Sequence, residues 1–121
     1  LAFDDAGRVL LVRHSYGSGR WLLPGGGIGR GETPLAAALR ELAEEAACAL
    51  EDPREIAVIE EPLAGTVNRV HIVAGQARGQ PHPDGREIIA AAFFALDDLP
   101  ADLNGVVERN LRGWVRTAKA G

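Results

Sequence analysis

The chain has 121 residues, a formal net charge of −4 at pH 7, 46 % hydrophobic residues and 25 % charged residues. This length fits a single domain with one core, and the balance is that of an ordinary globular protein. The negative charge excludes nucleic-acid binding through a broad basic surface, but a small phosphorylated ligand needs only a local site. No apolar run approaches the roughly 20 residues of a membrane-spanning helix, so we expect neither a nucleic-acid polymer nor a membrane as partner.

The cysteine and methionine content predicts the cellular compartment of the protein and indicates residues before Leu1. The single cysteine, Cys48, cannot form an intramolecular disulfide, and we expect a small buried residue in a protein of the reducing cytoplasm. The chain contains no methionine and opens within a strand-like pattern, so we expect further residues before Leu1. Because no linker or repeat interrupts it, residues 1–121 are predicted to form one domain.

The first 24 residues predict short strands separated by turns. Residues 1–3 precede a turn at Asp5–Gly7, and residues 8–14, "RVLLVRH", contain the β-rich apolar run Val9–Val12. Residues 21–24, "WLLP", predict a further short strand that ends at a proline and three glycines.

A helix is predicted to begin after Thr33. Thr33 is a good N-cap, and Pro34 suits the first helical position, where no amide hydrogen is needed. Apolar residues at helical spacing predict the buried face, which would consist of Leu35, Leu39, Leu42 and Ala46. On a helical wheel the acidic residues lie away from this stripe and share one side; they are Glu41, Glu44 and Glu45.

The second half of the chain predicts three more strands and a closing helix. Strands are expected over residues 54–61 and 67–75, followed by a loop rich in glycine and proline over 78–87. The apolar run at 88–96 predicts a central strand. The final helix would bury one face formed by Leu111, Trp114, Val115 and Ala118. A helix set among strands, with a second helix closing the chain, predicts an α/β sandwich.

Three carboxylates within one helical turn pose an electrostatic problem. Two unit charges about 4 Å apart repel by about 1 kcal/mol in water and about 4 kcal/mol at an effective dielectric of about 20. Mg²⁺ and Mn²⁺ prefer oxygen ligands, often a carboxylate or two together with substrate phosphates. Glycines beside such a cluster let the backbone approach a ligand closely. The combination predicts a metal-assisted phosphate site. Neither feature is specific alone, because an acidic helix is usually a solvent-exposed surface and "GGG" is usually a flexible loop.

The spacing of these residues is more specific than either feature. Gly26 is followed after five residues by Glu32 and after seven more by Arg40–Glu45, "RELAEE". This resembles the signature of the Nudix hydrolases, G-x5-E-x7-R-E-U-x-E-E-x-G-U, in which U is a bulky aliphatic residue. The chain departs from the signature at Ala47, where the family usually has glycine, and loosely at Cys48. The segments "GRVLLVRH", "WLLPGGG" and "FFALDDLP" extend the resemblance along the chain.

The resemblance implies a fold, a reaction and a cofactor. The fold is an α/β/α sandwich with a mixed β-sheet between helices. The reaction is hydrolysis of a nucleoside diphosphate linked to another moiety, by water attack on a phosphorus of the pyrophosphate, with Mg²⁺ or Mn²⁺ as cofactor. The implied metal ligands are the carboxylates of Glu41, Glu44 and Glu45 and the backbone carbonyl of Gly25. Arg40 is implied to hold a carboxylate of the signature in place, with Glu32 or a helix glutamate as its partner.

The catalytic base stays open at this point. In the family it is sometimes a glutamate of the signature, here Glu41, and sometimes a glutamate on a loop outside it, where this chain has Glu87. Many members carry a second acid three residues further on, and here that position is Ala90. Contacts to the substrate are expected from the glycine loop and from a basic strand residue that could steer phosphates; these are Gly25, Gly26, Gly27 and Arg69.

The sequence does not identify the nucleotide, so the expected partner is a nucleotide-type small molecule bound to a monomer or homodimer. The alternative function is a catalytically weak Nudix-fold module that binds or senses a nucleotide. Such modules typically lose a carboxylate or the arginine of the signature. Here Arg40 and all three helix glutamates are present, which favours the enzyme.

Overall fold

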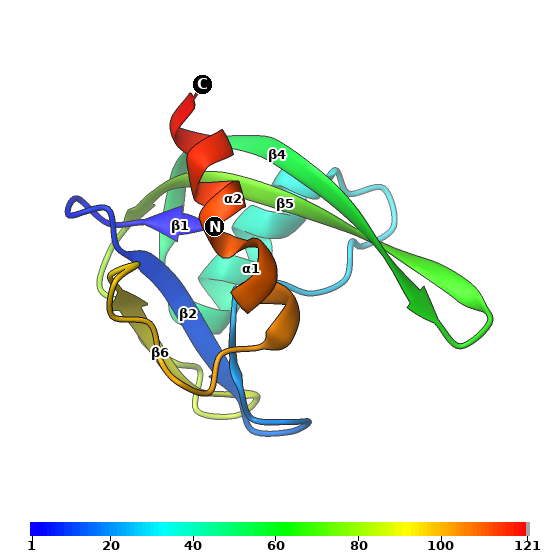
Figure 1. The fold of residues 1–121 in the computed structure, drawn as a ribbon, viewed down its shortest axis with the longest axis horizontal. Helices are drawn as coiled ribbons and strands as arrows, with labels where there is room; N and C mark the ends of the chain where they lie inside the picture. Colours follow the sequence, from blue (N-terminus) through cyan, green and yellow to red (C-terminus); the bar gives the residue numbers. More distant parts are fainter. Residues whose placement is uncertain (121) are drawn as a thin grey trace.

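The computed structural model describes residues 1–120, which form a mixed β-sheet with a helix on each face (Figure 1). The strands are β1 (Ala2–Phe3), β2 (Val9–His14), β3 (Trp21–Leu22), β4 (Ala49–Leu63), β5 (Thr66–Arg78) and β6 (Ile88–Phe94). The helices are α1 (Pro34–Ala46) and α2 (Gly105–Ala120). The sheet runs β3-β2-β1-β5-β4, with β6 paired to β2; β1 and β5 are parallel, and the other strand pairs are antiparallel. This confirms the expected α/β fold.

The two faces of β2 explain why one helix covers each side of the sheet. Successive side chains of a strand point to opposite faces. Val9 and Leu11 join a core with α2 residues such as Trp114, whereas Leu10 joins a second core with α1 residues such as Leu42. The apolar run Val9–Val12 therefore requires a cover on both sides, and the two amphipathic helices provide it.

The strands β4 and β5 form the longest hairpin of the fold. They pair from Ala49↔Arg78 to Leu63↔Thr66 around a two-residue turn at Ala64–Gly65. The strands predicted over 54–61 and 67–75 are confirmed but are shorter than the observed ones. The turn end of the hairpin, coloured green, reaches beyond the helices in Figure 1. Residues of the same hairpin just before this end, including Glu61 and Asn68, line the cavity described below.

The prediction of a central strand over 88–96 is wrong. Strand β6 ends at Phe94, and the only partner it has among residues 1–120 is β2, so it lies at an edge of the sheet. Phe93 packs against one core and Phe94 against the other. An edge strand that is packed from above and below has the same apolar composition as a central strand, which is why composition misled the prediction.

The predicted buried face of α1 is also partly wrong. Leu42 and Ala46 are buried as expected, but Leu39 is 38 % exposed and Glu45 is buried. The helix is rotated about its axis from the orientation that its leucines favour, which turns Glu45 toward the sheet. Hydrophobic periodicity assumes that the most apolar face packs inward, and here a carboxylate replaces one of the expected leucines.

Other local expectations hold. Thr33 accepts a hydrogen bond from the amide of Ala36 and caps α1, with Pro34 in the first turn. Cys48 is buried and free. The apolar face of α2 is buried at Leu111 and Trp114. Across residues 1–120, neither helix has the length and apolar character needed to cross a membrane.

Helix α1 ends at Ala47 in the left-handed conformation, with φ 57° and ψ 31°, and the Ala47 amide donates to the carbonyl of Ala43. A residue with a Cβ is strained there by about 1 kcal/mol relative to glycine. We therefore expect Ala47→Gly to raise the free energy of unfolding by about 0.5–1 kcal/mol in denaturant titrations. The control Ala43→Gly lies inside the helix and should lower it by about 1 kcal/mol. Destabilisation by both variants would contradict the assignment of strain to Ala47.

Candidate active site

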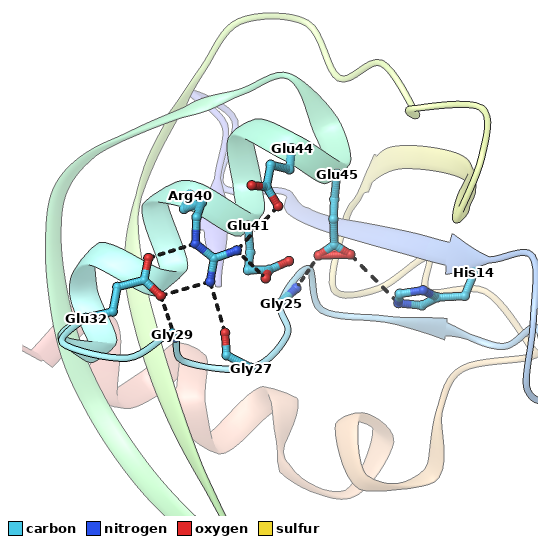
Figure 2. Close-up of polar contacts among 9 residues, drawn as sticks. All are labelled: His14, Gly25, Gly27, Gly29, Glu32, Arg40, Glu41, Glu44 and Glu45. Atoms are coloured by element: carbon cyan, nitrogen blue, oxygen red, sulfur yellow. Dashed lines mark hydrogen bonds and ion pairs between the residues drawn. The ribbon is translucent and has the colours of Figure 1, made fainter.

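The four charged residues of the signature on α1 face different surroundings. The side chain of Glu44 is 60 % exposed, that of Glu41 is 17 % exposed, and that of Glu45 is 7 % exposed. Arg40 lies between them and the preceding loop (Figure 2). The sequence predicted one acidic edge, but the helix presents the three carboxylates to solvent, to the loop and to the protein interior respectively.

Arg40 joins the helix to the loop through its whole guanidinium group, as Figure 2 shows. Its Nε and Nη2 donate to the two carboxylate oxygens of Glu32 at 2.7 and 2.9 Å. Its Nη1 donates to Glu41 at 2.8 Å and to Glu44 at 3.4 Å. Nη2 also donates to the carbonyl of Gly27 at 3.0 Å. Arg40 thus bonds both to Glu32 and to helix carboxylates, the two kinds of partner that the resemblance implied.

The loop between β3 and α1 is held by the same carboxylate. Glu32 accepts a hydrogen bond from the amide of Gly29 at 2.7 Å in addition to those from Arg40. These bonds stabilise the charged form and lower the pKa of Glu32 to about 2. At Gly26 a Cβ would lie 2.8 Å from Glu41 Cδ, so a side chain there would displace the Glu41 carboxylate from its position beside Arg40. Glycine at this position lets the loop pass close to that carboxylate.

Glu45 is the buried member of the cluster (Figure 2). Its Oε1 accepts from the amide of Gly25 at 2.7 Å, and its Oε2 lies 3.8 Å from Nε2 of His14. Burial raises the pKa of Glu45 to about 7; the Gly25 amide opposes this rise, and the nearby charges of Glu41, Asp84 and Glu87 add to it. Carboxylates that together raise a pKa in this way form a site of high negative potential.

The loop before β6 brings Glu87 to the same side of the molecule as Glu45. Its exposed residue Glu87 accepts through the backbone carbonyl from the amide of Ser15 at 2.7 Å. Asp84 accepts from the amides of Arg86 and Ile88, both at 2.8 Å, which shapes the loop. Sequence reasoning gave Asp84 no role; an Asp-Gly pair signals a turn but not the distant helix that its carboxylate faces.

A cavity of about 610 Å³ lies beside the cluster. Its lining includes Glu41, a β5 stretch that contains Arg69, and the three predicted loop glycines Gly25, Gly26 and Gly27. The guanidinium of Arg69 pairs with Glu60 at 3.1 Å and is largely exposed. Apolar walls come from the core, including Trp114. The volume and mixed lining match those of small-molecule sites.

The chemistry of the donor set fits a hard divalent cation, but the ligands are not preassembled. Within residues 1–120, no three His, Cys, Asp or Glu side chains already converge on one ligating position. Glu41 and Glu44 bond to Arg40, and Glu45 bonds to the Gly25 amide. These oxygen donors, with a raised pKa on the buried one, are the type that Mg²⁺ and Mn²⁺ prefer.

Comparisons with known proteins show what this chain is similar to. The NUDIX domain model matches residues 1–114. A Mycobacterium tuberculosis protein named "Putative 8-oxo-dGTP diphosphatase 2" is 36 % identical over 110 residues, which cover 86 % of this chain and 72 % of that protein. The MutT NUDIX hydrolase from Burkholderia pseudomallei has 29 % identity and a TM-score of 0.79, over 96 % of this chain and 92 % of that chain. The MutT protein from Methanosarcina mazei Go1, at 22 % identity and a TM-score of 0.72 over 99 % and 89 %, shares the fold.

The sequence signature is thus present at its full spacing, and its arginine bonds to its glutamates across the loop that separates them. The family model spans almost the whole chain, and a relative at 36 % identity covers most of it. This chain belongs to the NUDIX family and is a Nudix hydrolase.

Proposed function

We propose that this Nudix hydrolase is a divalent-metal-dependent pyrophosphohydrolase of nucleoside triphosphates, in which water attacks a phosphorus and a bridging P–O bond breaks to leave a nucleoside monophosphate and pyrophosphate. The observation that carries the proposal is the intact cluster of Arg40 and three glutamates, of which Glu41 lines a cavity of about 610 Å³. Similarity to a mycobacterial protein named for 8-oxo-dGTP supports the triphosphate class. Nudix hydrolases generally use divalent metals, and the carboxylate cluster supports the same for this chain.

The residues that would hold Mg²⁺ or Mn²⁺ are the carboxylates of Glu41, Glu44 and Glu45 and the carbonyl of Gly25. When bound, the ion would supply charge neutralisation for the phosphates and for the charge that develops in the transition state. Burial is the main cause of the raised pKa of Glu45, and the repulsion that Glu41, Asp84 and Glu87 add to it would be relieved by a bound cation. This accounts for why a stable fold retains such a cluster.

The other residues of the site would position the substrate and the attacking water. The glycine loop Gly25–Gly27 would lie against the diphosphate, where side chains would obstruct it. Arg40 would keep the loop and the carboxylates in register through its bidentate bond to Glu32. Arg69, which lines the cavity but is exposed and paired with Glu60, would steer the phosphates toward the site. The proton of the water would pass to Glu41 or Glu87, the two candidate bases.

The proposal predicts metal-dependent release of nucleoside monophosphate. We would measure it across ordinary and oxidised nucleoside triphosphates, ADP-ribose, nucleotide sugars and dinucleoside polyphosphates, each with Mg²⁺, with Mn²⁺ and with a chelator. Turnover of triphosphates that stops with chelator is the expected result. Turnover confined to ADP-ribose or sugars would overturn the triphosphate class. Binding by calorimetry without turnover of any compound would instead identify a nucleotide-binding module.

Glu45→Gln tests the buried carboxylate through both stability and activity. In the metal-free protein the pKa of Glu45 is about 7 when folded and near 4.5 when unfolded, so the folded state holds the proton more tightly. Stability from this group is therefore present at low pH and is lost as pH rises from about 4.5 to about 7. At pH 8 we expect Glu45→Gln without metal to be more stable than the parent by about 2–3 kcal/mol, with no gain near pH 4.5.

The same variant should lose metal-dependent hydrolysis. Glu44→Gln is the matched control for stability, because the Glu44 side chain is 60 % exposed and its removal should change the free energy of unfolding little at either pH. Denaturant titrations at pH 4.5 and pH 8 measure both variants. Destabilisation of Glu45→Gln at pH 8 would show that the buried charge is stabilised in the metal-free fold, contrary to this account.

Arg40→Lys tests whether the guanidinium positions the site. A lysine keeps the charge but cannot form the bidentate bond to Glu32 while also reaching Glu41 and Gly27. We expect kcat/KM to fall about 10–100-fold with the fold retained. Arg8→Lys is the control, because Arg8 forms a comparable Nε–carboxylate pair with Asp4 away from the cavity. Equal kcat/KM in the two variants would contradict the positioning role.

A further inference from the structure

The cavity has a polar region on the β4–β5 hairpin that the reaction at phosphorus does not use. Three consecutive cross-strand pairs lie toward the turn end of this hairpin: Ile59↔Val70, Glu60↔Arg69 and Glu61↔Asn68. Because side chains alternate between faces, the first and third pairs share one face of the hairpin and the middle pair lies on the other. The side chains of the shared face therefore comprise an apolar pair next to a polar pair.

Packing identifies which face is turned inward. Ile59 and Val70 pack against the α2-side core, and both line the cavity. Glu61 and Asn68 line the cavity as well. The middle pair has a different environment: Glu60 and Arg69 are exposed and bond to each other at 3.1 Å, and only Arg69 of the two lines the cavity. The polar pair thus lies on the inward face, in the same cavity as the glycine loop and Glu41.

The hydrogen-bonding capacity of the pair is free for a ligand. Glu60 is neutralised by Arg69, whereas no hydrogen bond or ion pair joins the Glu61 or Asn68 side chain to any other described residue. An ionised carboxylate accepts two adjacent hydrogen bonds, and an asparagine amide donates through its NH₂ group. Directly opposite residues on antiparallel strands have Cβ atoms about 5 Å apart. The pair therefore offers two acceptors beside a donor over the width of one base edge.

Resting on the proposed function, we propose that Glu61 and Asn68 are specificity-determining residues that bind the Watson–Crick edge of a guanine base. Guanine presents N1–H and N2–H as adjacent donors, which match the Glu61 carboxylate, and O6 as an acceptor, which matches the Asn68 amide. Ile59 and Val70 lie next to them on the same face and would contact the ring.

Other bases fit this arrangement poorly. Adenine places the N1 acceptor where the carboxylate requires a donor, and two acceptors that face each other without a proton cost binding free energy. Rejection of a base that leaves polar groups unpaired is the strongest form of selectivity available to a binding site. A ribose diol could also donate twice to a carboxylate, but it would use no donor from Asn68. Guanine is the base whose edge uses both carboxylate oxygens of Glu61 together with the amide donor of Asn68.

The experiment compares Glu61→Gln with the parent on dGTP, GTP and dATP in the presence of Mg²⁺, and measures dGMP and dAMP affinity by calorimetry. The amide replaces one acceptor with a donor at unchanged size. We expect kcat/KM for dGTP and GTP to fall at least tenfold, with dATP unchanged or improved, and dGMP affinity to fall in parallel. Glu51→Gln is the matched control on the same strand, because Glu51 pairs with Arg78 outside the cavity and should leave all values unchanged.

Two results would overturn the inference while the proposed function stands. An equal change for dGTP and dATP would show that Glu61 does not read the base, and a fall for GTP alone would assign it to the ribose. Failure of the proposed function is distinguishable, because the parent would then hydrolyse none of the three triphosphates. In that event the ratio of dGMP to dAMP affinity in Glu61→Gln still decides the inference: a loss of preference for dGMP supports it, and an unchanged ratio overturns it.

Discussion

The bidentate bond between Arg40 and Glu32 is the interaction on which the site depends. It joins the loop after β3 to α1, and the same guanidinium group bonds to Glu41, Glu44 and the carbonyl of Gly27. A single cation thus fixes the position of a flexible glycine loop relative to a rigid helix. The planar guanidinium is suited to this task because its five donors have fixed directions. The loop needs its glycines so that its backbone can approach a ligand closely. The bonds from Arg40 restrict the conformational freedom that these glycines would otherwise have.

A second constraint is that the three helix carboxylates differ in exposure and in their bonding partners. Glu44 is exposed to solvent, Glu41 is bonded to Arg40, and Glu45 is buried with a pKa near 7. Water and Arg40 lower the electrostatic cost of the first two, whereas Glu45 is buried with a hydrogen bond from the Gly25 amide and with His14 Nε2 at 3.8 Å. Burial and the charges of Glu41, Asp84 and Glu87 thus act together on the one carboxylate that faces the sheet.

Much of the local structure was predictable from particular residues. Thr33 and Pro34 mark the start of α1 because cap and first-turn chemistry act within a few residues. The apolar stripe of α2 is buried as its spacing predicts. The edge position of β6 and the exposure of Leu39 were not predictable, because both depend on which element packs against which face. Burial is a property of the assembled chain, and periodicity reports only how apolar a face is.

By itself the sequence determined the family, the signature residues and their spacing, because a pattern of fixed intervals survives without knowledge of the fold. Only the tertiary structure decided which of those residues are buried, which are exposed and which other residues they contact. It brought Asp84 and Glu87 toward Glu45 from a loop about 40 residues away in the chain, and it placed Glu61 opposite Asn68 on the inward face of a hairpin. The physical reason is that pKa values, pairing register and cavity walls arise from contacts between distant segments. Such contacts depend on the packing of the whole sheet and both helices, which local residue preferences do not encode.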